Sequence, residues 1–512
     1  MKRKQEPVDQ LESYTNPFKG VLHTPPFTGN STVALGGRAT TAATAAVTAT
    51  TTNLTVVCKQ CPQATLAATY AVPLAHLPTN WMESDWFTRL TLTKQASQCA
   101  TTGPPEPLVT YFIDNGKLHL PRFEGRRLFG DCNDTRTSGE PMSDNVGFVG
   151  QLCSITPPQV AATAAVMQEL TVNGGAMLIL PCGFGKTVCA LWLAYTLHRR
   201  ALVVVNSANL LRQWKKRVEQ FLPNARIGII QQTLVQVHDC DIVIGMLQSL
   251  SKKTYDTHIL PSFGTVIVDE AHHIAAPMFS KAMRKLPAKH VIGLSATPDR
   301  ADGLGIALNW FMGAEAYRAH RTQDKVDVRM LIYTRGDQTE LVYRNGKVRY
   351  PEMVNRMVDD QLRQQYVHTL ILRYYNTGRH VLVLCDRRSQ VLDFGRLIGL
   401  TRPDINIGIV LGGMKEGVTE PALACQLIIS TFHYFSEGAD VPRLDTLILA
   451  TPRGNIEQAV GRILRPHPLK ATPLVVDICD PFSLFSGMMW KRHRYYRQNK
   501  YSVVKMDDIQ DL

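Results

Sequence analysis

Residues 178–187 constrain the fold of this chain more than any other stretch. An apolar run there leads into a glycine-rich turn, and residues 188–195 then follow a helical pattern. The turn holds the residue types that a polyphosphate site needs, which are Gly183, Gly185, Lys186 and Thr187. Glycines let backbone N–H groups approach phosphate oxygens, the lysine supplies a positive charge, and the hydroxyl suits Mg²⁺. Strand, loop and helix in this order predict a nucleotide phosphate loop, because the helix N-terminus then faces the phosphates.

Two neighbouring acids lie at the end of a second apolar run. Asp269 and Glu270 follow Val266-Ile-Val, and His272 comes two residues later. A nucleotide hydrolase needs one carboxylate to hold Mg²⁺ and a second to orient the attacking water. Consecutive acids at a strand end can also form a solvated turn, but their place after the phosphate loop favours the catalytic interpretation.

Apolar runs and amphipathic segments alternate from about residue 151 onward. The runs are continuous, as in strands buried on both faces of a parallel sheet. They form one set at 178–180, 201–205, 241–245, 265–270 and 290–295, and a second at 380–385, 405–410, 426–431, 446–450 and 473–477. The pattern predicts an α/β fold class with two doubly wound parallel-sheet domains in tandem. Residues 301–330 are expected to connect them.

The region before residue 151 differs in composition. Residues 1–55 include an Ala/Thr-rich stretch without large apolar residues, so we expect a disordered segment. Short β-like runs in residues 56–150 predict a small mixed α+β accessory domain, with a hairpin turn at Asp114-Asn115-Gly116. The predicted division continues with an ATP-binding domain at 151–317, a second domain at 318–480, and a basic aromatic tail at 481–512.

Composition narrows the class of protein. The 512 residues are 45% hydrophobic and 19% charged, and no apolar run approaches bilayer-spanning length, so no membrane segment is expected. The basic first residues lead into polar ones, which argues against secretion. Eleven cysteines, an odd number, indicate reduced thiols in a cytoplasm-like compartment. The net charge of +13 favours a polyanionic partner.

Cys58 and Cys61 have the spacing of half a zinc site. No second pair of Cys or His follows at ligand spacing, since Cys99, Cys132 and Cys153 are scattered. Free thiols are therefore the preferred interpretation, and a zinc site is the alternative.

Three motifs make residues 151–500 resemble the superfamily 2 helicases. They are the DEAH form Asp269-Glu270-Ala271-His272, the triplet Ser295-Ala296-Thr297, and the segment from Ile456 to Arg465. Segments 293–303 and 435–442, with Leu180 ahead of the phosphate loop, are most similar to the XPB-like branch. Ala301 stands where the XPB-type Arg-Glu-Asp element has Glu, so the resemblance does not extend to a strand-opening wedge of that type.

The accessory pattern at 118–130 and the basic, Tyr-rich tail are also similar to the helicases of large cytoplasmic DNA viruses, such as the poxvirus transcript-release helicase. This resemblance implies two RecA-like domains, ATP and Mg²⁺ as cofactors, and the cytoplasm or a virion as the location. It also implies nucleic acid as the partner, with DNA expected and RNA as the alternative. Transcription or replication machinery is a further implied partner.

The resemblance assigns roles at the nucleotide site. The implied catalytic residues are Lys186, Asp269, Glu270, Gln458, Arg462 and Arg465, and the implied Mg²⁺ ligands are Thr187 and Asp269. Arg462 and Arg465 lie three apart on one helical face and would reach the γ-phosphate, with a surface ion-pair face as the alternative. The amide of Gln159 would form hydrogen bonds with the edge of the adenine base. The alternative is that Gln159 only lies next to a helix cap.

The implied nucleic-acid contacts lie at strand ends, where hydroxyls, amides and backbone N–H groups can hold phosphates without reading bases. They are Ser207, Gln213, Met246, Gln248 and Ser249 in the first domain, and Arg387, Gly412, Gly413 and Thr431 in the second. Each residue type is also common in caps and turns. The segment from Trp490 to Tyr501 interleaves cations and aromatics, which suits nucleic acid or, equally, a helix that packs on the second domain.

Coupling between the two sites is the implied role of Ser295, Thr297 and His272. The two hydroxyls would bond to His272 and pass the state of the γ-phosphate to the nucleic-acid face. The alternative is that they cap the turn before Pro298.

The expected function is that of an ATP-driven helicase or translocase. A non-hydrolysing nucleic-acid-binding subunit and an RNA-directed helicase are the alternatives, and the intact phosphate loop and carboxylate pair favour the motor. The motor subunit of a restriction-type nuclease would need a separate nuclease, because this chain has no convincing nuclease motif.

Overall fold

The computed structural model describes residues 63–93, 107–155, 157–270, 276–296, 304–321, 325–335, 338–343, 346, 348–436, 439, 441–468 and 470–506. Several predicted features lie outside these residues. They are the disordered segment at 1–55, the cysteine pair Cys58 and Cys61, and the coupling residues His272 and Thr297.

A small sheet precedes the two large ones. Its strand order is β5-β6-β2-β1-β7, with the bounds β1 Thr65–Leu66, β2 Tyr70–Pro73, β5 Phe112–Asp114, β6 Lys117–Leu120 and β7 Asn133–Asp134. Helices α1 (Asp85–Thr88) and α2 (Arg122–Phe129) and the strand pair β3 (Thr91–Leu92) and β4 (Leu108–Val109) accompany it. The predicted hairpin turn is confirmed, because β5 pairs antiparallel with β6 and Asn115 and Gly116 have φ of 47° and 69°.

One buried arginine fixes this small sheet to the first large domain. Arg122, in the first turn of α2, donates from Nη1 to the carbonyl of Ala288 at 2.9 Å and from Nη2 to that of Leu286 at 2.5 Å. Burial lowers the pKa of the Arg122 guanidinium to about 9. The two carbonyls replace the water that the cation loses, so Arg122 holds α2 against the domain.

The first large sheet is parallel except at one edge. Its order is β11-β10-β12-β9-β13-β14-β8-β15, and only β11 is antiparallel to its neighbour among the described pairs. The bounds are β8 Gly175–Ile179, β9 Ala201–Val205, β10 Ile227–Gln231, β11 Leu234–Gln236, β12 Ile242–Met246, β13 Thr265–Val268, β14 His290–Ser295 and β15 Ala314–Arg318. Its central strands are buried, apart from His290 at the start of β14, as their continuous apolar sequence predicts.

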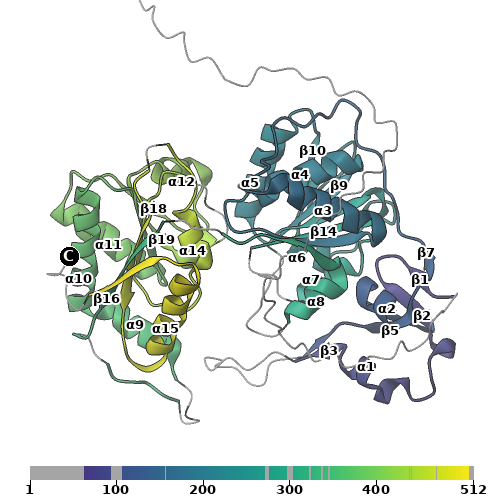
Figure 1. The fold of residues 1–512 in the computed structure, drawn as a ribbon, viewed down its shortest axis with the longest axis horizontal. Helices are drawn as coiled ribbons and strands as arrows, with labels where there is room; N and C mark the ends of the chain where they lie inside the picture. Colours follow the sequence, from purple (N-terminus) through teal and green to yellow (C-terminus); the bar gives the residue numbers. More distant parts are fainter. Residues whose placement is uncertain are drawn as a thin grey trace, which may run out of the picture. The chain divides into compact units, whose positions relative to one another are not determined.

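Helices cover both faces of the first sheet (Figure 1). One face carries α3 (Gln159–Val172), α4 (Lys186–Leu197) and α5 (Ala208–Phe221), and the other carries α6 (Leu247–Lys252), α7 (Ala276–Met283) and α8 (Gly305–Met312). The layers are those of a RecA-like domain.

The second sheet is parallel throughout its described pairs. Its order is β18-β19-β17-β20-β21-β16-β22. The bounds are β16 Asp327–Ile332, β17 Val381–Cys385, β18 Ile407–Val410, β19 Leu427–Thr431, β20 Thr446–Leu449, β21 Leu474–Cys479 and β22 Ser502–Met506. The fold class of two tandem RecA-like parallel sheets, preceded by a small sheet, is therefore confirmed.

The helices of the second domain also form two layers. Helices α10 (Gln361–Asn376) and α11 (Arg388–Thr401) pack on one face. The other face carries α12 (Glu416–Leu423), α13 (Phe432–Ser436), α14 (Glu457–Arg462) and α15 (Ser483–Gln498), and α9 (Tyr350–Asp359) packs against Phe485 of α15.

Two segments add elements to the large domains. The described part of the expected connection at 301–330 includes α8 and β15, which belong to the first domain, and β16, which pairs with β21. The basic segment after residue 480 supplies α15 and β22 to the second domain, and Phe485, Tyr496 and Tyr501 are buried. The segment therefore packs on the second domain, which is one of its two predicted uses, and its contact with nucleic acid remains a prediction.

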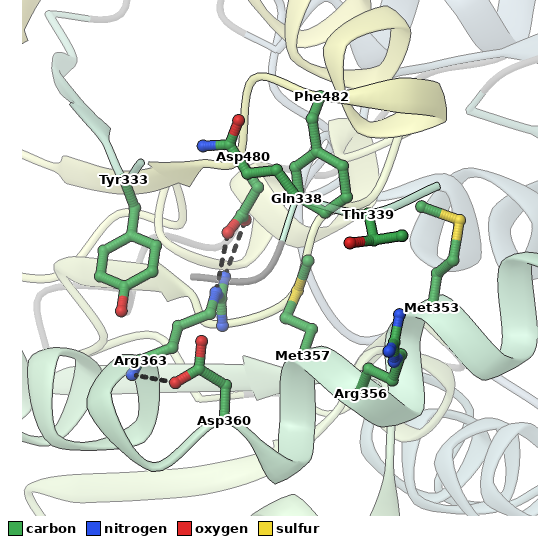
Figure 2. A pocket seen from close by; sticks show the side chains of 10 residues that line it. All are labelled: Tyr333, Gln338, Thr339, Met353, Arg356, Met357, Asp360, Arg363, Asp480 and Phe482. Atoms are coloured by element: carbon green, nitrogen blue, oxygen red, sulfur yellow. Dashed lines mark hydrogen bonds and ion pairs between the residues drawn. The ribbon is translucent and has the colours of Figure 1, made fainter. Parts of the chain in front are cut away.

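A buried ion pair closes the carboxyl end of the second sheet. The side chains of Arg363 and Asp480 point toward each other in Figure 2 and form two hydrogen bonds of 2.9 Å. Arg363 also donates to the carbonyl of Ala450 at 2.8 Å. The adjoining hollow has a volume of about 30 Å³, room for one or two water molecules. Arg363 and Asp480 therefore tie α10 to the ends of β20 and β21.

Replacing Asp480 by Ala is expected to destabilise the second domain by about 3–5 kcal/mol, because the guanidinium of Arg363 stays buried without its counter-charge. The matched control is Asp404→Ala, which removes an exposed partner of Arg402 and should cost less than about 1 kcal/mol. Urea unfolding of the full chain measures both. Equal midpoints for the two variants would contradict this role.

Candidate nucleotide and nucleic-acid site

The loop between β8 and α4 needs glycine at two positions. Gly183 has φ of 87° and Gly185 has φ of 80°, which L side chains rarely adopt. At Gly185 a Cβ atom would also lie 2.3 Å from Nε2 of Gln159. The turn therefore holds its backbone in the open conformation that a polyphosphate cradle requires.

Three side chains donate hydrogen bonds to carbonyls of this loop. Lys186 Nζ donates to Leu180 at 3.2 Å, Gln159 Nε2 donates to Phe184 at 3.1 Å, and the Arg321 guanidinium donates to Cys182. Gln159 Oε1 also accepts from the backbone N–H of Cys153 at 2.9 Å. The amide of Gln159 thus braces the loop in this structure, and contact with adenine remains a prediction.

The two acids predicted from the sequence lie beside Lys186. Asp269 follows β13 and is buried, and Oε1 of Glu270 lies 4.0 Å from Nζ of Lys186. Glu270 has φ of 47°, so the chain turns sharply after the strand. Asp269 also accepts from the backbone N–H of Glu270 at 2.9 Å. The end of β13 and the start of α4 thereby bring one cation and two carboxylates together.

Burial sets the protonation of this group. Burial disfavours the charged form of Lys186 and by itself would lower its pKa. Attraction by Glu270, Cys182 and Asp269 is stronger, so the pKa of the ammonium lies above its usual value. Burial, followed by repulsion from Glu270, raises the pKa of Asp269 to about 6. Lys186 is therefore a permanent cation at the loop.

Trp214 is a site residue that the sequence analysis missed. It lies on α5 with 1% of its surface exposed, and its indole N–H donates to Oδ2 of Asp269 at 2.7 Å. The helical periodicity predicted that Trp214 would be buried, but the pattern contains no signal for its polar atom. The hydrogen bond fixes the orientation of the Asp269 carboxylate.

A cavity of about 530 Å³ joins these residues to the second domain. Among the residues that line it are Gly183, Gly185, Lys186, Thr187, Gln213, Trp214, Asp269, Glu270, Arg462 and Arg465. Gln213, on α5 one residue before Trp214, also lines this cavity, and its predicted contact with nucleic acid remains a prediction. The volume is that of a small-molecule site.

Helix α14 approaches the loop closely. Nη1 of Arg462 and Nη1 of Arg465 both donate to the carbonyl of Ala439 at 3.1 Å. A Cβ atom on Gly461 would lie 2.7 Å from Cβ of Cys182, so only glycine permits this approach. Gln458 is buried on the same helix. Arg462 is buried and Arg465 lines the cavity. The two arginines therefore do not form the surface ion-pair face that was the alternative prediction.

The predicted nucleic-acid residues of the first domain, other than Gln213, lie after the carboxyl ends of β9 and β12. Ser207 caps α5 by accepting from the N–H of Leu210 at 3.3 Å, and Met246 ends β12. Gln248 donates to the carbonyl of Asn206 at 2.8 Å, and Ser249 accepts from the N–H of Gln232 at 2.8 Å. Gln248 and Ser249 therefore hold strand ends together, and Ser207 caps a helix. The contact of all these residues with nucleic acid remains a prediction.

In the second domain the predicted residues follow β17, β18 and β19. Arg387 donates to Asn355 at 2.8 Å and pairs with Asp386, while Gly412 and Gly413 are exposed. Thr431 is buried and accepts from the N–H of Tyr434 at 3.4 Å. These positions share the carboxyl edge of one parallel sheet, as predicted for a common face.

Of the coupling residues, the structure describes Ser295. It ends β14, and its carbonyl accepts from the N–H of Leu180 at 3.1 Å. Ser295 therefore adjoins the start of the phosphate loop, which is the position that a coupling role requires.

The described residues contain no group of three or more His, Cys, Asp or Glu that could hold a metal ion. Their eight cysteines are free thiols. None of the helices in the described part of the chain is long and apolar enough to cross a membrane.

The chain is similar to several known proteins. Residues 152–300 match the family described as type III restriction enzyme, res subunit. The chain is 29% identical over 405 residues to "Putative ATP-dependent RNA helicase L396" of Acanthamoeba polyphaga mimivirus, covering 77% of each chain. It is 27% identical over 363 residues to QP509L of African swine fever virus, a protein named in the same way, covering 66% of this chain and 71% of the relative. The RNA- and ADP-BeF₃-bound structure of S. cerevisiae Dbp5 has 13% identity and a TM-score of 0.49, covering 68% of this chain and 90% of that one.

Replacing Trp214 by Phe is expected to lower ATP turnover by about 10–100-fold, because the apolar ring is kept while the hydrogen bond that orients Asp269 is lost. Trp310→Phe is the matched control, since Trp310 is also buried but lies on α8, away from the cavity. Steady-state ATPase assays compare the two. Similar turnover in both variants would show that the indole N–H has no orienting role.

Proposed function

We propose that this chain, a superfamily 2 helicase related to those of large DNA viruses and thus a nucleic-acid-dependent ATPase, converts ATP hydrolysis into movement along a nucleic-acid strand. The observation that carries the proposal is the single cavity lined by Lys186, Asp269, Glu270 and Arg465. A non-hydrolysing binding subunit would not need a carboxylate pair beside the phosphate loop.

Each group has a role in hydrolysis. The backbone around Gly183 and Gly185, with Lys186, would bind the β- and γ-phosphates. Glu270 would orient the attacking water and accept its proton. Arg462 and Gln458 lie on α14, whereas Arg465 follows the end of that helix, so the two arginines do not share one helical face. Both arginines would still stabilise the charge of the transferred phosphoryl group from the second domain.

The cavity suits Mg²⁺ held by few protein ligands. Thr187 and Asp269 both line it, and Asp269 is oriented from behind by Trp214. Mg²⁺ usually takes one or two protein ligands and completes its coordination with phosphates and water. A bound magnesium ion would neutralise phosphate charge at this place.

Nucleic acid is proposed to bind along the carboxyl edges of both sheets. Ser207, Met246, Gln248, Ser249 and, in the second domain, Arg387, Gly412, Gly413 and Thr431 are the proposed contacts. Ser295, through its place beside Leu180, would transmit the nucleotide state to this edge together with Thr297 and His272. Gln159 would add contact with adenine when its bond to the loop opens.

DNA is the proposed substrate, in transcription termination, transcript release or repair, with the transcription or replication machinery as partner. RNA is the second candidate, and the names of the mimivirus and African swine fever virus relatives favour it. Stimulation of ATP turnover by single-stranded DNA and by single-stranded RNA of equal length decides between them.

Glu270→Gln is expected to keep ATP affinity within a few-fold and to lower ATP turnover by at least about 100-fold, because the water loses its base. Glu169→Gln is the isosteric control, since Glu169 lies on α3 and accepts from Asn173. Nucleotide binding by fluorescence and single-turnover hydrolysis give the two quantities. Unchanged hydrolysis in Glu270→Gln would refute the assignment.

Arg465→Ala is expected to lower ATP turnover by about 10³-fold, as loss of an arginine finger does, with a much smaller change in ATP affinity. Arg396→Ala, which removes an exposed arginine of α11, should leave both unchanged. A loss of affinity without a loss of turnover would assign Arg465 to binding instead of catalysis.

A further inference from the structure

Helix α15 has one face that the second domain does not use. Its buried face consists of Phe485, Arg492 and Tyr496, and Arg492 pairs with Asp477 at 2.9 Å. The opposite face carries Trp490, His493, Arg494 and Arg497, which are spaced three and four residues apart. Trp490 is 56% exposed, unusual for the largest apolar side chain. The helix thus presents an aromatic and basic stripe to solvent.

The stripe continues onto the neighbouring strand. Nζ of Lys505, on β22, lies 5.3 Å above the ring of Trp490, and the rings of Trp490 and His493 meet edge to face at 5.7 Å. Trp490, His493, Arg494 and Arg497 line a hollow of about 530 Å³. We call Trp490, His493, Arg494, Arg497 and Lys505 the α15–β22 surface.

The cations of this surface have no acidic counterpart in the described structure. No carboxylate among the described residues forms an ion pair with Arg494, Arg497 or Lys505, and α15 contains no acid. Burial, and then repulsion from Lys505 and Arg497, lower the pKa of His493. The surface therefore has a concentrated positive potential that a polyanion would neutralise.

We propose that the α15–β22 surface is a second binding site for single-stranded nucleic acid, in addition to the carboxyl edges of the sheets. An exposed indole among guanidinium groups supplies the two interactions that single strands use, stacking of a base and neutralisation of phosphates. A duplex keeps its bases stacked on one another, so the ring of Trp490 favours a single strand. The surface would bind the part of the nucleic-acid strand that has already passed the two RecA-like domains. This inference rests on the proposed function.

The position of the surface separates it from the predicted strand-end contacts. Helix α15 begins after the carboxyl end of β21 and runs back to the start of β22, so Arg494 and Arg497 lie toward the amino edge of the sheet. Ser207, Arg387 and the other strand-end residues lie at the carboxyl edges. The two sets of contacts therefore occupy different edges, and variants of one set can be made without altering the other.

Binding of a fluorescein-labelled dT homopolymer, followed by anisotropy in the full chain, tests the proposal. Trp490→Ala is expected to weaken binding roughly tenfold, and Trp490→Phe should retain most of the affinity, because stacking survives. Arg494→Ala with Arg497→Ala should reduce the slope of log affinity against log salt by roughly 1.4, since each phosphate contact contributes about 0.7 for single strands. ATP turnover without nucleic acid should stay at the wild-type level in every variant.

The matched control is Arg373→Ala with Arg396→Ala, which removes two exposed charges from the opposite face of the same sheet and should leave the salt slope unchanged. Wild-type affinity in the Trp490 and arginine variants would overturn the α15–β22 surface while leaving the proposed function intact. Failure of the wild-type chain to bind both the dT homopolymer and a U homopolymer of equal length would instead overturn the proposed function. If the variants lost binding only to anionic phospholipid vesicles, the surface would be a membrane site and the proposal would be wrong.

Discussion

The nucleotide site depends on holding one lysine and two carboxylates close together with little exposure to solvent. Asp269 and Glu270 follow the end of β13. Lys186 begins α4, after the loop that follows β8, and only β14 separates β8 from β13 in the sheet. Their mutual attraction and repulsion shift their protonation, and that tension persists because the surrounding strands are fully buried and rigid. Mg²⁺ bound with the nucleotide would add positive charge beside the two carboxylates.

The second domain completes this arrangement through close backbone approach. Gly461 lets α14 lie against Cys182 of the loop, and Arg321 bonds to the same residue from the connection between the domains. Gln159 of α3 also donates to the loop, so three different parts of the chain contact it. Movement of α14 or of the connection would change the loop directly, which is the physical requirement for coupling nucleotide state to domain motion.

Much of the fold could be predicted because its signals are local. Continuous apolar runs mark the central strands of both sheets, and the hairpin at Asn115-Gly116 follows from two residues that tolerate positive φ. Edge strands such as β15 and β22 were missed, since their side chains are largely exposed and their sequences lack a continuous apolar run. The sequence also did not predict the hydrogen bonds of Trp214 to Asp269, of Arg321 to Cys182 and of Gln159 to Phe184. A hydrogen bond between distant residues leaves no periodic pattern in the sequence.

The central claim is that nucleic acid at the strand ends controls chemistry in the shared cavity. ATP turnover by the full chain, measured while single-stranded DNA or RNA is titrated at saturating ATP, tests it most directly. Turnover is expected to rise to a plateau with at least one of the two, and the plateau should be lost when Lys186 is replaced by Ala. Equal turnover with and without either nucleic acid, in a chain that binds ATP, would contradict it.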